Sequence, residues 1–285
     1  MPPNATSPVP RRRRRNRQPL PGAVNAAPGR EPYHRHTKRL VFATYLAPCN
    51  RRLYEYVARA CEATDFIVGR DWRELADGAI DVAFVCSPPM VWLEGAVEAL
   101  AAPVFADPRF GGRPIYASDV IVPIDSTAAR FEDLQGARWA VNEDSSWSGY
   151  WVTLARVGDW SYFDDVVEAG FHHKAIRLVA EGSVDGAAID SQVLAFELRE
   201  HPELGARIKV IDTLGPAPSQ PVVVRAALDQ EERTALLDRL FALSRPELRR
   251  HLFERFAPAP DYRLVAGVVS SFATRSREPQ WLQNP

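Results

Sequence analysis

From residue 38 to about residue 262, short β-rich runs alternate with amphipathic runs whose apolar positions recur every three or four residues. In the first half, strands are expected at 39–46, 65–69, 80–87 and 114–125, and helices at 50–64, 71–78 and 91–102. The first of these helices places Leu53, Val57, Ala60 and Cys61 on one face, and Gly78 ends the second. Strands and helices that alternate at this spacing are typical of βαβ units and a mostly parallel sheet.

The same alternation continues in the second half of the chain. Strands are expected at 138–142, 184–190, 208–214 and 220–228, and helices from the serine-rich segment near residue 146 to about Val157, at 172–182 and at 191–202. Two further helices are expected within 230–258, and residues 278–285 are expected to form a loose end. Such a chain of 285 residues is long enough for one large domain or two smaller ones.

Residues 1–37 differ in composition from the remainder. They contain eight of the 24 prolines and the run Arg11 to Arg15, with almost no apolar periodicity. Such a segment buries too little surface to offset the entropy of ordering, so we expect a disordered basic tail. The stretch after Arg17 is too short and too rich in proline for the apolar part of a secretory signal, which favours the cytoplasm for the chain as written.

Charge and cysteine content exclude several classes of function. Residues 1–40 carry a net charge of +9, which leaves −10 on the rest, so we expect no nucleic-acid binding by the folded body. The three cysteines form no CxxC pair, and neither a disulfide framework nor a bound metal is expected. No run of about 20 apolar residues is present, so no membrane span is expected.

The segment "NEDSSWSG", residues 142–149, joins an expected strand to an expected helix, and we call it the serine corner. Ser145, Ser146 and Ser148 offer hydroxyl donors, and Gly149 lets the backbone approach a ligand closely. Helix N-termini at the carboxyl ends of strands attract anions. The alternative is that one serine caps the helix and the others are turn residues, although three hydroxyls exceed what one cap needs.

Two more helix starts are expected at the same edge of the sheet. His172, which follows Gly170 and Phe171, can donate to an anion, although a lone histidine is more often structural. Asp190 ends a strand, where an aspartate is as often a helix cap as a ligand group. A serine hydrolase is disfavoured because "SWSGY" lacks the first glycine of G-x-S-x-G and because the order Ser, His, Asp is unusual for that class.

Longer segments carry a family resemblance. The stretches "FEDLQGARWAVNEDSSWSGYW" and "GFHHKAIRLVAEGSVDGAAIDSQVL" resemble the phosphonate-type solute-binding proteins of ABC importers, in which an S-x-S-G-Y corner precedes a G-x-H helix start and a V-x-x-G-x-x-D-x-A-x-I-D stretch. The similarity covers about residues 38–262. It implies a two-lobed α/β fold of the type II periplasmic-binding-protein class, with a mixed, mostly parallel sheet in each lobe and a ligand held between the lobes.

The resemblance also implies lobe boundaries and ligand-binding residues. The first lobe would contain residues 38–118 and a return segment with the C-terminal tail at 218–285, and the second lobe residues 119–217. The implied oxyanion site comprises Ser145, Ser146, Ser148, Gly149, Tyr150 and His172, with Asp190 opposite and Tyr45, Cys86 and Ser87 as wall residues of the first lobe.

The expected function is therefore capture of a small oxyanion, a phosphonate or a phosphate ester, without chemical change. No catalytic residue, cofactor or metal is expected, and the partners would be the anionic ligand and an ABC permease. We expect a monomer. The family is extracytoplasmic, which leaves the compartment open. An enzyme on the same fold, using His172 or His173 as acid or base, and a ligand sensor with a basic tail are the alternatives.

Overall fold

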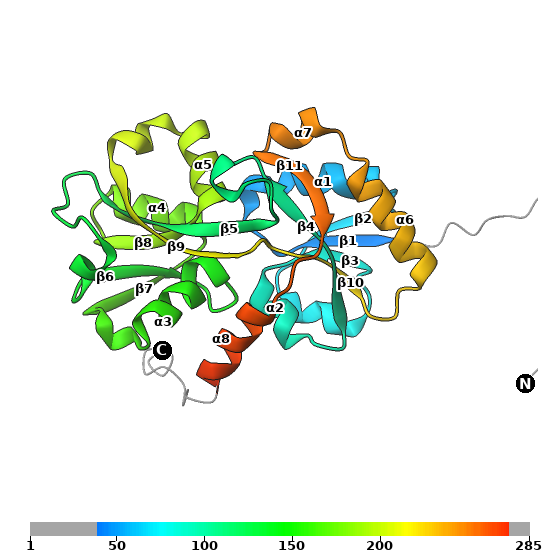
Figure 1. The fold of residues 1–285 in the computed structure, drawn as a ribbon, viewed down its shortest axis with the longest axis horizontal. Coiled ribbons are helices and arrows are strands. Elements are labelled where there is room, and N and C mark those ends of the chain that lie inside the picture. The colour runs from blue at the N-terminus through cyan, green and yellow to red at the C-terminus, as the bar shows by residue number, and fades with distance from the viewer. Residues whose placement is uncertain (1–38, 274–285) are drawn as a thin grey trace, which may run out of the picture. The chain divides into compact units, whose positions relative to one another are not determined.

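The computed structural model describes residues 39–273, which form two lobes built on separate sheets (Figure 1). The sheet of the first lobe has six strands in the order β11-β4-β10-β3-β1-β2, and that of the second lobe has five in the order β7-β6-β8-β5-β9. The two-lobed α/β fold that the sequence implies is therefore confirmed. The expected basic tail at 1–37 and the loose end at 278–285 lie outside the described residues.

The first lobe combines strands from both ends of the described chain. Its strands are β1 (Val41–Thr44), β2 (Asp65–Val68), β3 (Val82–Phe84), β4 (Val97–Phe105), β10 (Val222–Arg225) and β11 (Phe253–Pro258). Its helices are α1 (Arg51–Ala60), α2 (Ser87–Trp92), α6 (Gln230–Phe241), α7 (Arg245–Arg249) and α8 (Arg263–Ala273).

The second lobe is formed by the middle of the chain. Its strands are β5 (Ile115–Pro123), β6 (Arg138–Asn142), β7 (Asp165–Gly170), β8 (Gly186–Asp190) and β9 (Ile208–Pro218). Its helices are α3 (Val152–Val157), α4 (His172–Ala180) and α5 (Ser191–Glu200). A π-helical turn, Trp147–Trp151, runs directly into α3.

Both sheets are mixed, with more antiparallel pairing than the sequence predicts. In the first lobe β1 is parallel to β2 and β3, whereas β10 is antiparallel to β3 and β4, and β11 to β4. In the second lobe β6 is parallel to β7 and β8, and β5 is antiparallel to β8 and β9. Each antiparallel pair contains a strand that directly precedes or follows a crossing between the lobes, β4, β5, β9 or β10, and local periodicity does not reveal these crossings.

Several expected elements are wrong in detail. The expected helix at 91–102 is instead the end of α2 followed by β4, whose last five residues are all buried. Residues 97–102 are rich in Ala and Leu and do not alternate between buried and exposed positions, and pairing with β10 and β11 overrides this local preference for a helix. Residues 72–77 form a 3-10 helix, and Ala60 is exposed rather than on the buried face of α1. Strands β7 and β11 and helix α8 were not predicted.

Large aromatic side chains fill the core of the second lobe beneath the serine corner. Trp139 of β6 is fully buried and stacks on Phe163 at 4.9 Å between ring centroids. Gly186 of β8 leaves the space for this ring, because a Cβ there would lie 2.8 Å from Trp139. The tight packing of β6 against β8 fixes the strand end from which the serine corner emerges.

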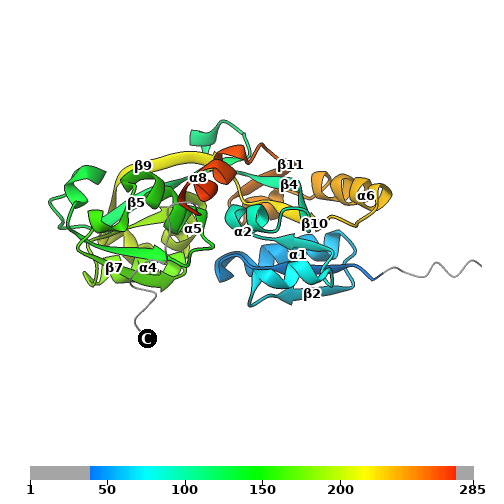
Figure 2. The same cartoon turned by 90° about the horizontal axis from the view of Figure 1, so that it is seen from below.

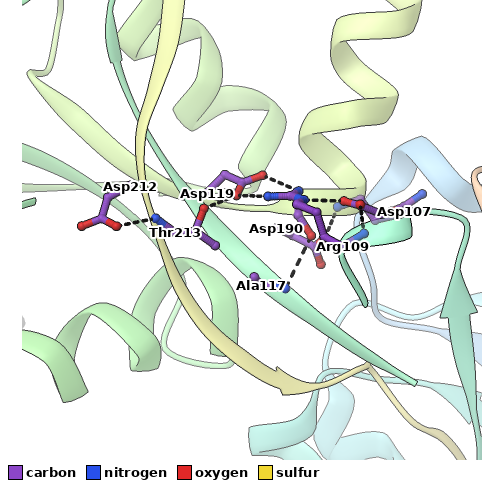
Figure 3. A network of polar contacts seen from close by, with 9 residues as sticks. Asp107, Arg109, Ala117, Asp119, Asp190, Asp212 and Thr213 are labelled. Carbon is purple, nitrogen blue, oxygen red and sulfur yellow. Dashed lines mark hydrogen bonds and ion pairs between the residues drawn. The ribbon is translucent and has the colours of Figure 1, made fainter. Parts of the chain in front are cut away.

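The chain changes sheets twice, between Phe105 and Ile115 and between Pro218 and Val222. The first crossing is fastened to the second lobe by Arg109, whose guanidinium makes two hydrogen bonds of 2.9 and 3.0 Å to buried Asp119 of β5 and one of 2.7 Å to Asp107 (Figure 3). Thr213 of β9 donates a further bond of 2.9 Å to Asp119. The lobe boundaries that we placed at residues 118 and 217 stay predictions.

The second crossing is fastened to the first lobe. The Ser219 hydroxyl donates to the Pro103 carbonyl at 2.6 Å, and the Tyr262 hydroxyl donates to the Ser219 carbonyl at 2.7 Å. Beyond Tyr262, helix α8 runs beside α2, as both views show (Figures 1 and 2). Within residues 39–273, no helix combines the length and apolar character that a bilayer crossing requires.

Candidate functional site

A cavity lies between the two lobes, at the carboxyl ends of β3, β6 and β8. The space available to the centres of water-sized molecules amounts to about 70 Å³. One water molecule needs roughly 10–15 Å³ of such space, so the cavity has room for a small guest. Its lining includes Tyr45, Asn50, Tyr54, Cys86, Phe105, Asn142, Glu143, Ser145, Ser146, Ser148, Phe171, His172, Asp190, Gln192 and Gln220.

Ser146 caps the π-helical turn and still keeps a proton to donate. Its Oγ accepts hydrogen bonds from the Gly149 amide at 3.1 Å and from Asn142 Nδ2 at 3.4 Å. Since both acceptor positions of the hydroxyl are then used, its O–H remains available to a ligand. Gly149 is required here, because a Cβ would lie 2.5 Å from the Asn142 side chain. Capping and ligand binding are therefore compatible roles for Ser146.

Ser148 and His172 form a buried pair at the back of the cavity. Ser148 Oγ lies 2.8 Å from His172 Nε2, and the two residues are 2% and 5% exposed. Burial, with a smaller effect from His173, lowers the pKa of His172 to about 3, so the imidazole is neutral at physiological pH. No described residue pairs with its Nδ1. The pair consequently lacks the carboxylate that orients the histidine in a Ser-His-Asp triad.

Asp190 borders the cavity and also caps α5. One carboxylate oxygen accepts from the Gln192 and Val193 amides at 2.8 and 3.3 Å, and the other accepts from the side chain of Gln220 in the second crossing. Burial raises the pKa of Asp190 to about 6, although these hydrogen bonds oppose the shift. The cap that we weighed against a ligand role is real, and it leaves the carboxylate at the cavity wall.

The wall from the first lobe is aromatic and neutral. Tyr54 stacks on Phe84 at 4.5 Å, and the Tyr45 hydroxyl donates to Glu74 at 3.2 Å. The sulfur of Cys86 accepts a hydrogen bond of 3.3 Å from the Trp147 amide, which joins this wall to the start of the π-helical turn. Burial raises the pKa of Cys86 to about 12, so this residue is an uncharged thiol.

Three residues predicted for the site do not border the cavity. Gly149 contacts Asn142 from behind, and Tyr150 packs against Trp160 at 5.0 Å and accepts a hydrogen bond of 3.3 Å from its indole. Ser87 is buried at the start of α2, and its Oγ has no partner among the described residues. The other seven, Tyr45, Cys86, Ser145, Ser146, Ser148, His172 and Asp190, line the cavity. Their roles in ligand binding stay predictions.

Sequence reasoning missed an amide pair that joins the lobes. Asn50 Nδ2 donates to Gln192 Oε1 at 2.8 Å, and Gln192 Nε2 donates to Asn50 Oδ1 at 3.3 Å and to the His251 carbonyl at 3.0 Å. Each residue lies at a helix start, which was a usable signal. Nothing in the local sequence indicates that positions 142 residues apart meet.

The cavity has two carboxyl groups and no cationic side chain. Glu143, beside the serine corner, has its pKa raised by burial, an effect only partly opposed by Ser145. No lysine or arginine of residues 39–273 is among the lining residues. No group of three metal-ligating side chains occurs in that part of the chain either. The site therefore offers hydroxyl and amide donors to an anion.

Comparison with known proteins agrees with this architecture. The family described as "ABC transporter, phosphonate, periplasmic substrate-binding protein" matches residues 72–262, two thirds of the chain. Among solved structures, a PhnD1 protein from Prochlorococcus marinus in complex with methylphosphonate superposes with a TM-score of 0.69 at 14% identity, covering 82% of this chain and 98% of that one.

Two further structures share the fold. A binding protein component of an ABC phosphonate transporter from Pseudomonas aeruginosa has a TM-score of 0.63 at 20% identity, covering 78% of this chain and 81% of that one. A Xanthomonas citri protein bound to chloride has a TM-score of 0.65 at 18% identity, covering 83% and 99%. At these identities the structures show the fold alone. Because the family match spans most of the described body, the chain belongs to the phosphonate family of periplasmic substrate-binding proteins of ABC transporters, a family of binding proteins rather than enzymes.

Proposed function

We propose that this protein captures a small phosphonate anion in the interlobe cavity and holds it with uncharged donors. The single observation that carries the proposal is the arrangement of Ser146, Ser148 and His172, which places two serine hydroxyls and a neutral imidazole at one wall of the cavity. The size of the cavity supports a guest as small as methylphosphonate.

The direction of the hydrogen bond between Ser148 and His172 determines which of the two side chains can donate a proton to a ligand in the cavity. If Ser148 donated to Nε2, the proton of the neutral ring would sit on Nδ1, which has no described partner. A buried N–H without an acceptor is less well tolerated than an acceptor without a donor. This argument favours the tautomer in which His172 Nε2–H donates to Ser148 Oγ, and the Ser148 proton is then available to the ligand or to the neighbouring Tyr116 hydroxyl.

Neutral donors suffice because the cavity is buried. In a low-dielectric site each hydrogen bond to a charge is stronger than in water, and donors that are already held in place need no reorganisation. Glu143 and Asp190 disfavour a second negative charge on the ligand. The geometry thus favours a singly charged phosphonate, or one whose substituent offers donors to these carboxyls.

The ligand would then pass unchanged to the permease of an ABC importer. The cavity-lining residues Ser145, Ser146, Ser148, His172, Asp190, Tyr45 and Cys86 are the proposed ligand contacts, and no cofactor is assigned. The family to which the chain belongs is periplasmic, whereas the cytoplasmic expectation rests on residues 1–37, which lie outside the described part.

A thermal-shift series tests this function. Methylphosphonate, phosphite, phosphate, methanesulfonate and acetate would be added to the full chain, and a ligand at 100 times its dissociation constant stabilises the fold by about 2.7 kcal/mol. The proposal expects the largest shift from a phosphonate, which mass spectrometry should recover unaltered. A larger shift from acetate or methanesulfonate, or a chemically modified phosphonate, would contradict it.

A further inference from the structure

Beside the ligand cavity lies a second cavity of about 200 Å³. Its walls are Phe105, Ala106, Asp107, Phe110, Ser191, Gln192, Ala195 and Leu252. Two of these residues, Phe105 and Gln192, also line the ligand cavity. The two spaces are therefore neighbours that share a wall.

The second cavity offers little to a polar guest. The Asp107 carboxylate is held by Arg109 at 2.7 Å, and Ser191 Oγ accepts a hydrogen bond of 3.5 Å from the Ala117 amide. The Gln192 amide group is held by Asn50 and the His251 carbonyl. The other lining residues present apolar side chains, so burial of alkyl groups is the interaction that this space favours.

The two residues of the shared wall, Phe105 and Gln192, are held in place by different kinds of contact. Phe105 packs edge-on against Phe253 at 5.0 Å and against Tyr116 at 6.2 Å, within the core of the first lobe. Gln192 projects from the first turn of α5 in the second lobe and is 6% exposed. Its side chain is kept across the wall by hydrogen bonds to the first lobe alone.

We propose that Gln192 is a specificity-determining residue that limits the length of the substituent on the bound phosphonate, by separating the ligand cavity from the second cavity. This inference rests on the proposed function, because the ligand supplies the substituent. With Gln192 in place, a group longer than a methyl meets the amide that joins the lobes. Without that side chain, an unbranched alkyl chain of the same ligand has room to enter the second cavity.

The test is a calorimetric comparison of methyl-, ethyl-, propyl- and butylphosphonate with four forms of the full chain. Gln192→Ala opens the wall and removes the amide pair. Gln192→Leu removes the same hydrogen bonds but keeps a side chain of similar volume. Asn50→Ala breaks the amide pair from the other lobe but keeps the Gln192 side chain and its hydrogen bond to the His251 carbonyl. The readout is the ratio of the affinities for butylphosphonate and methylphosphonate. A variant that weakens the binding of both ligands by the same factor leaves this ratio unchanged.

Wild type, Gln192→Leu and Asn50→Ala should all favour methylphosphonate. In Gln192→Ala the ratio should shift towards butylphosphonate by about tenfold or more, the scale on which added methylenes are discriminated. An unchanged ratio in Gln192→Ala, or an equal shift in Gln192→Leu, would overturn the inference while leaving the proposed function intact. If wild type bound none of the four phosphonates, the proposed function itself would fail. Gln192→Ser opens the wall as well and serves if Gln192→Ala does not fold.

Discussion

Three side chains determine the charge and hydrogen-bond pattern of the cavity. Ser148 and His172 form a buried neutral pair, and Asp190 is a carboxylate whose pKa burial raises to about 6. A serine hydroxyl that accepts from the imidazole has its proton directed to the remaining space. At the residue scale, therefore, the site consists of neutral donors beside two carboxyl groups, Asp190 and Glu143.

Replacing Ser148 by alanine tests the direction of its hydrogen bonds. Ser148→Ala removes a donor to a charged ligand, which is worth about 1.5–3 kcal/mol, and should weaken methylphosphonate binding by roughly 10- to 150-fold. Isothermal titration calorimetry measures the loss. Ser161→Ala, at an exposed position of the same lobe, should bind as wild type does. Equal affinities of Ser148→Ala and Ser161→Ala would remove Ser148 from the site.

Asp190 should make stability fall with rising pH over a defined range. Between about pH 4 and pH 6 the unfolded state has lost the Asp190 proton and the folded state has kept it, so the free energy of unfolding falls as the pH rises, by up to about 1.4 kcal/mol per pH unit. His172 acts oppositely. Its unfolded ring is protonated below pH 6.5 and its folded ring is neutral down to about pH 3, so its contribution rises with pH.

The difference in unfolding free energy between Asp190→Asn and wild type shows the contribution of the Asp190 carboxyl group alone. The variant should gain stability relative to wild type as the pH rises from 4 to 6, and the gap should then level off. Urea unfolding at several pH values measures it. Asp77→Asn, which removes an exposed carboxyl of the first lobe, is the matched control. If the difference in unfolding free energy between Asp190→Asn and wild type were the same at every pH from 4 to 7, the raised pKa of Asp190 would be contradicted.

At the scale of elements, the π-helical turn Trp147–Trp151 faces both the ligand and the opposite lobe. Ser148 borders the cavity, whereas the Trp151 ring lies 6.2 Å from Trp92 of α2 and 6.3 Å from Phe272 of α8. Helix α8 thereby contacts the second lobe although it follows a strand of the first. We therefore expect the contact between the lobes and the position of the serine donors to be coupled through this turn.

Removing the aromatic contact should weaken binding without touching the ligand. Trp92 does not line the cavity, and aromatic pairs contribute about 0.5–1.5 kcal/mol, so Trp92→Ala should lower methylphosphonate affinity by roughly 2- to 12-fold. Calorimetry at a temperature well below unfolding measures this. Phe241→Ala, at an exposed aromatic residue of α6 away from the contact between the lobes, should leave affinity unchanged. A wild-type affinity in Trp92→Ala would argue against the coupling.

Arg109 holds the first crossing against β5 by hydrogen bonds to Asp119, so its replacement should lower the free energy of unfolding. Arg109→Ala leaves buried Asp119 with only Thr213 as a described partner, which should cost about 1–3 kcal/mol. Arg39→Ala breaks the exposed pair with Asp65 and should cost less than about 1 kcal/mol. Chemical denaturation measures both. Equal losses in the two variants would mean that the crossing is not held by this ion pair.

The sequence predicts elements best where periodicity is local. Strand β6 and helix α4 were located within a residue or two, because each has a regular apolar pattern and a clear start. Strand β4 was mistaken for a helix because residues 97–102 are rich in Ala and Leu, and only pairing with the distant strands β10 and β11 makes them a strand. Strand β11 and helix α8 were missed because they are positioned by packing on the opposite end of the chain.

At the scale of the whole molecule, two crossings join lobes that meet over a small cavity. The serine corner was predictable, since hydroxyls, a glycine and a helix start lie within eight residues. The opposing wall was predicted only in part. Tyr45 and Cys86 line the cavity, whereas Asn50 and Gln192 were missed because they pair across 142 positions of the sequence. Long-range complementarity of this kind is a property of the folded chain.

Calorimetric titration of methylphosphonate into wild type and into the double variant Ser146→Ala, Ser148→Ala tests most directly whether uncharged hydroxyl donors hold the anion. The account predicts saturable binding by wild type. It predicts that the double variant, folded as shown by an unchanged circular dichroism spectrum, loses at least about 100-fold in affinity, since two hydrogen bonds to a charge are removed. Methylphosphonate binding of equal strength by the two proteins would contradict it.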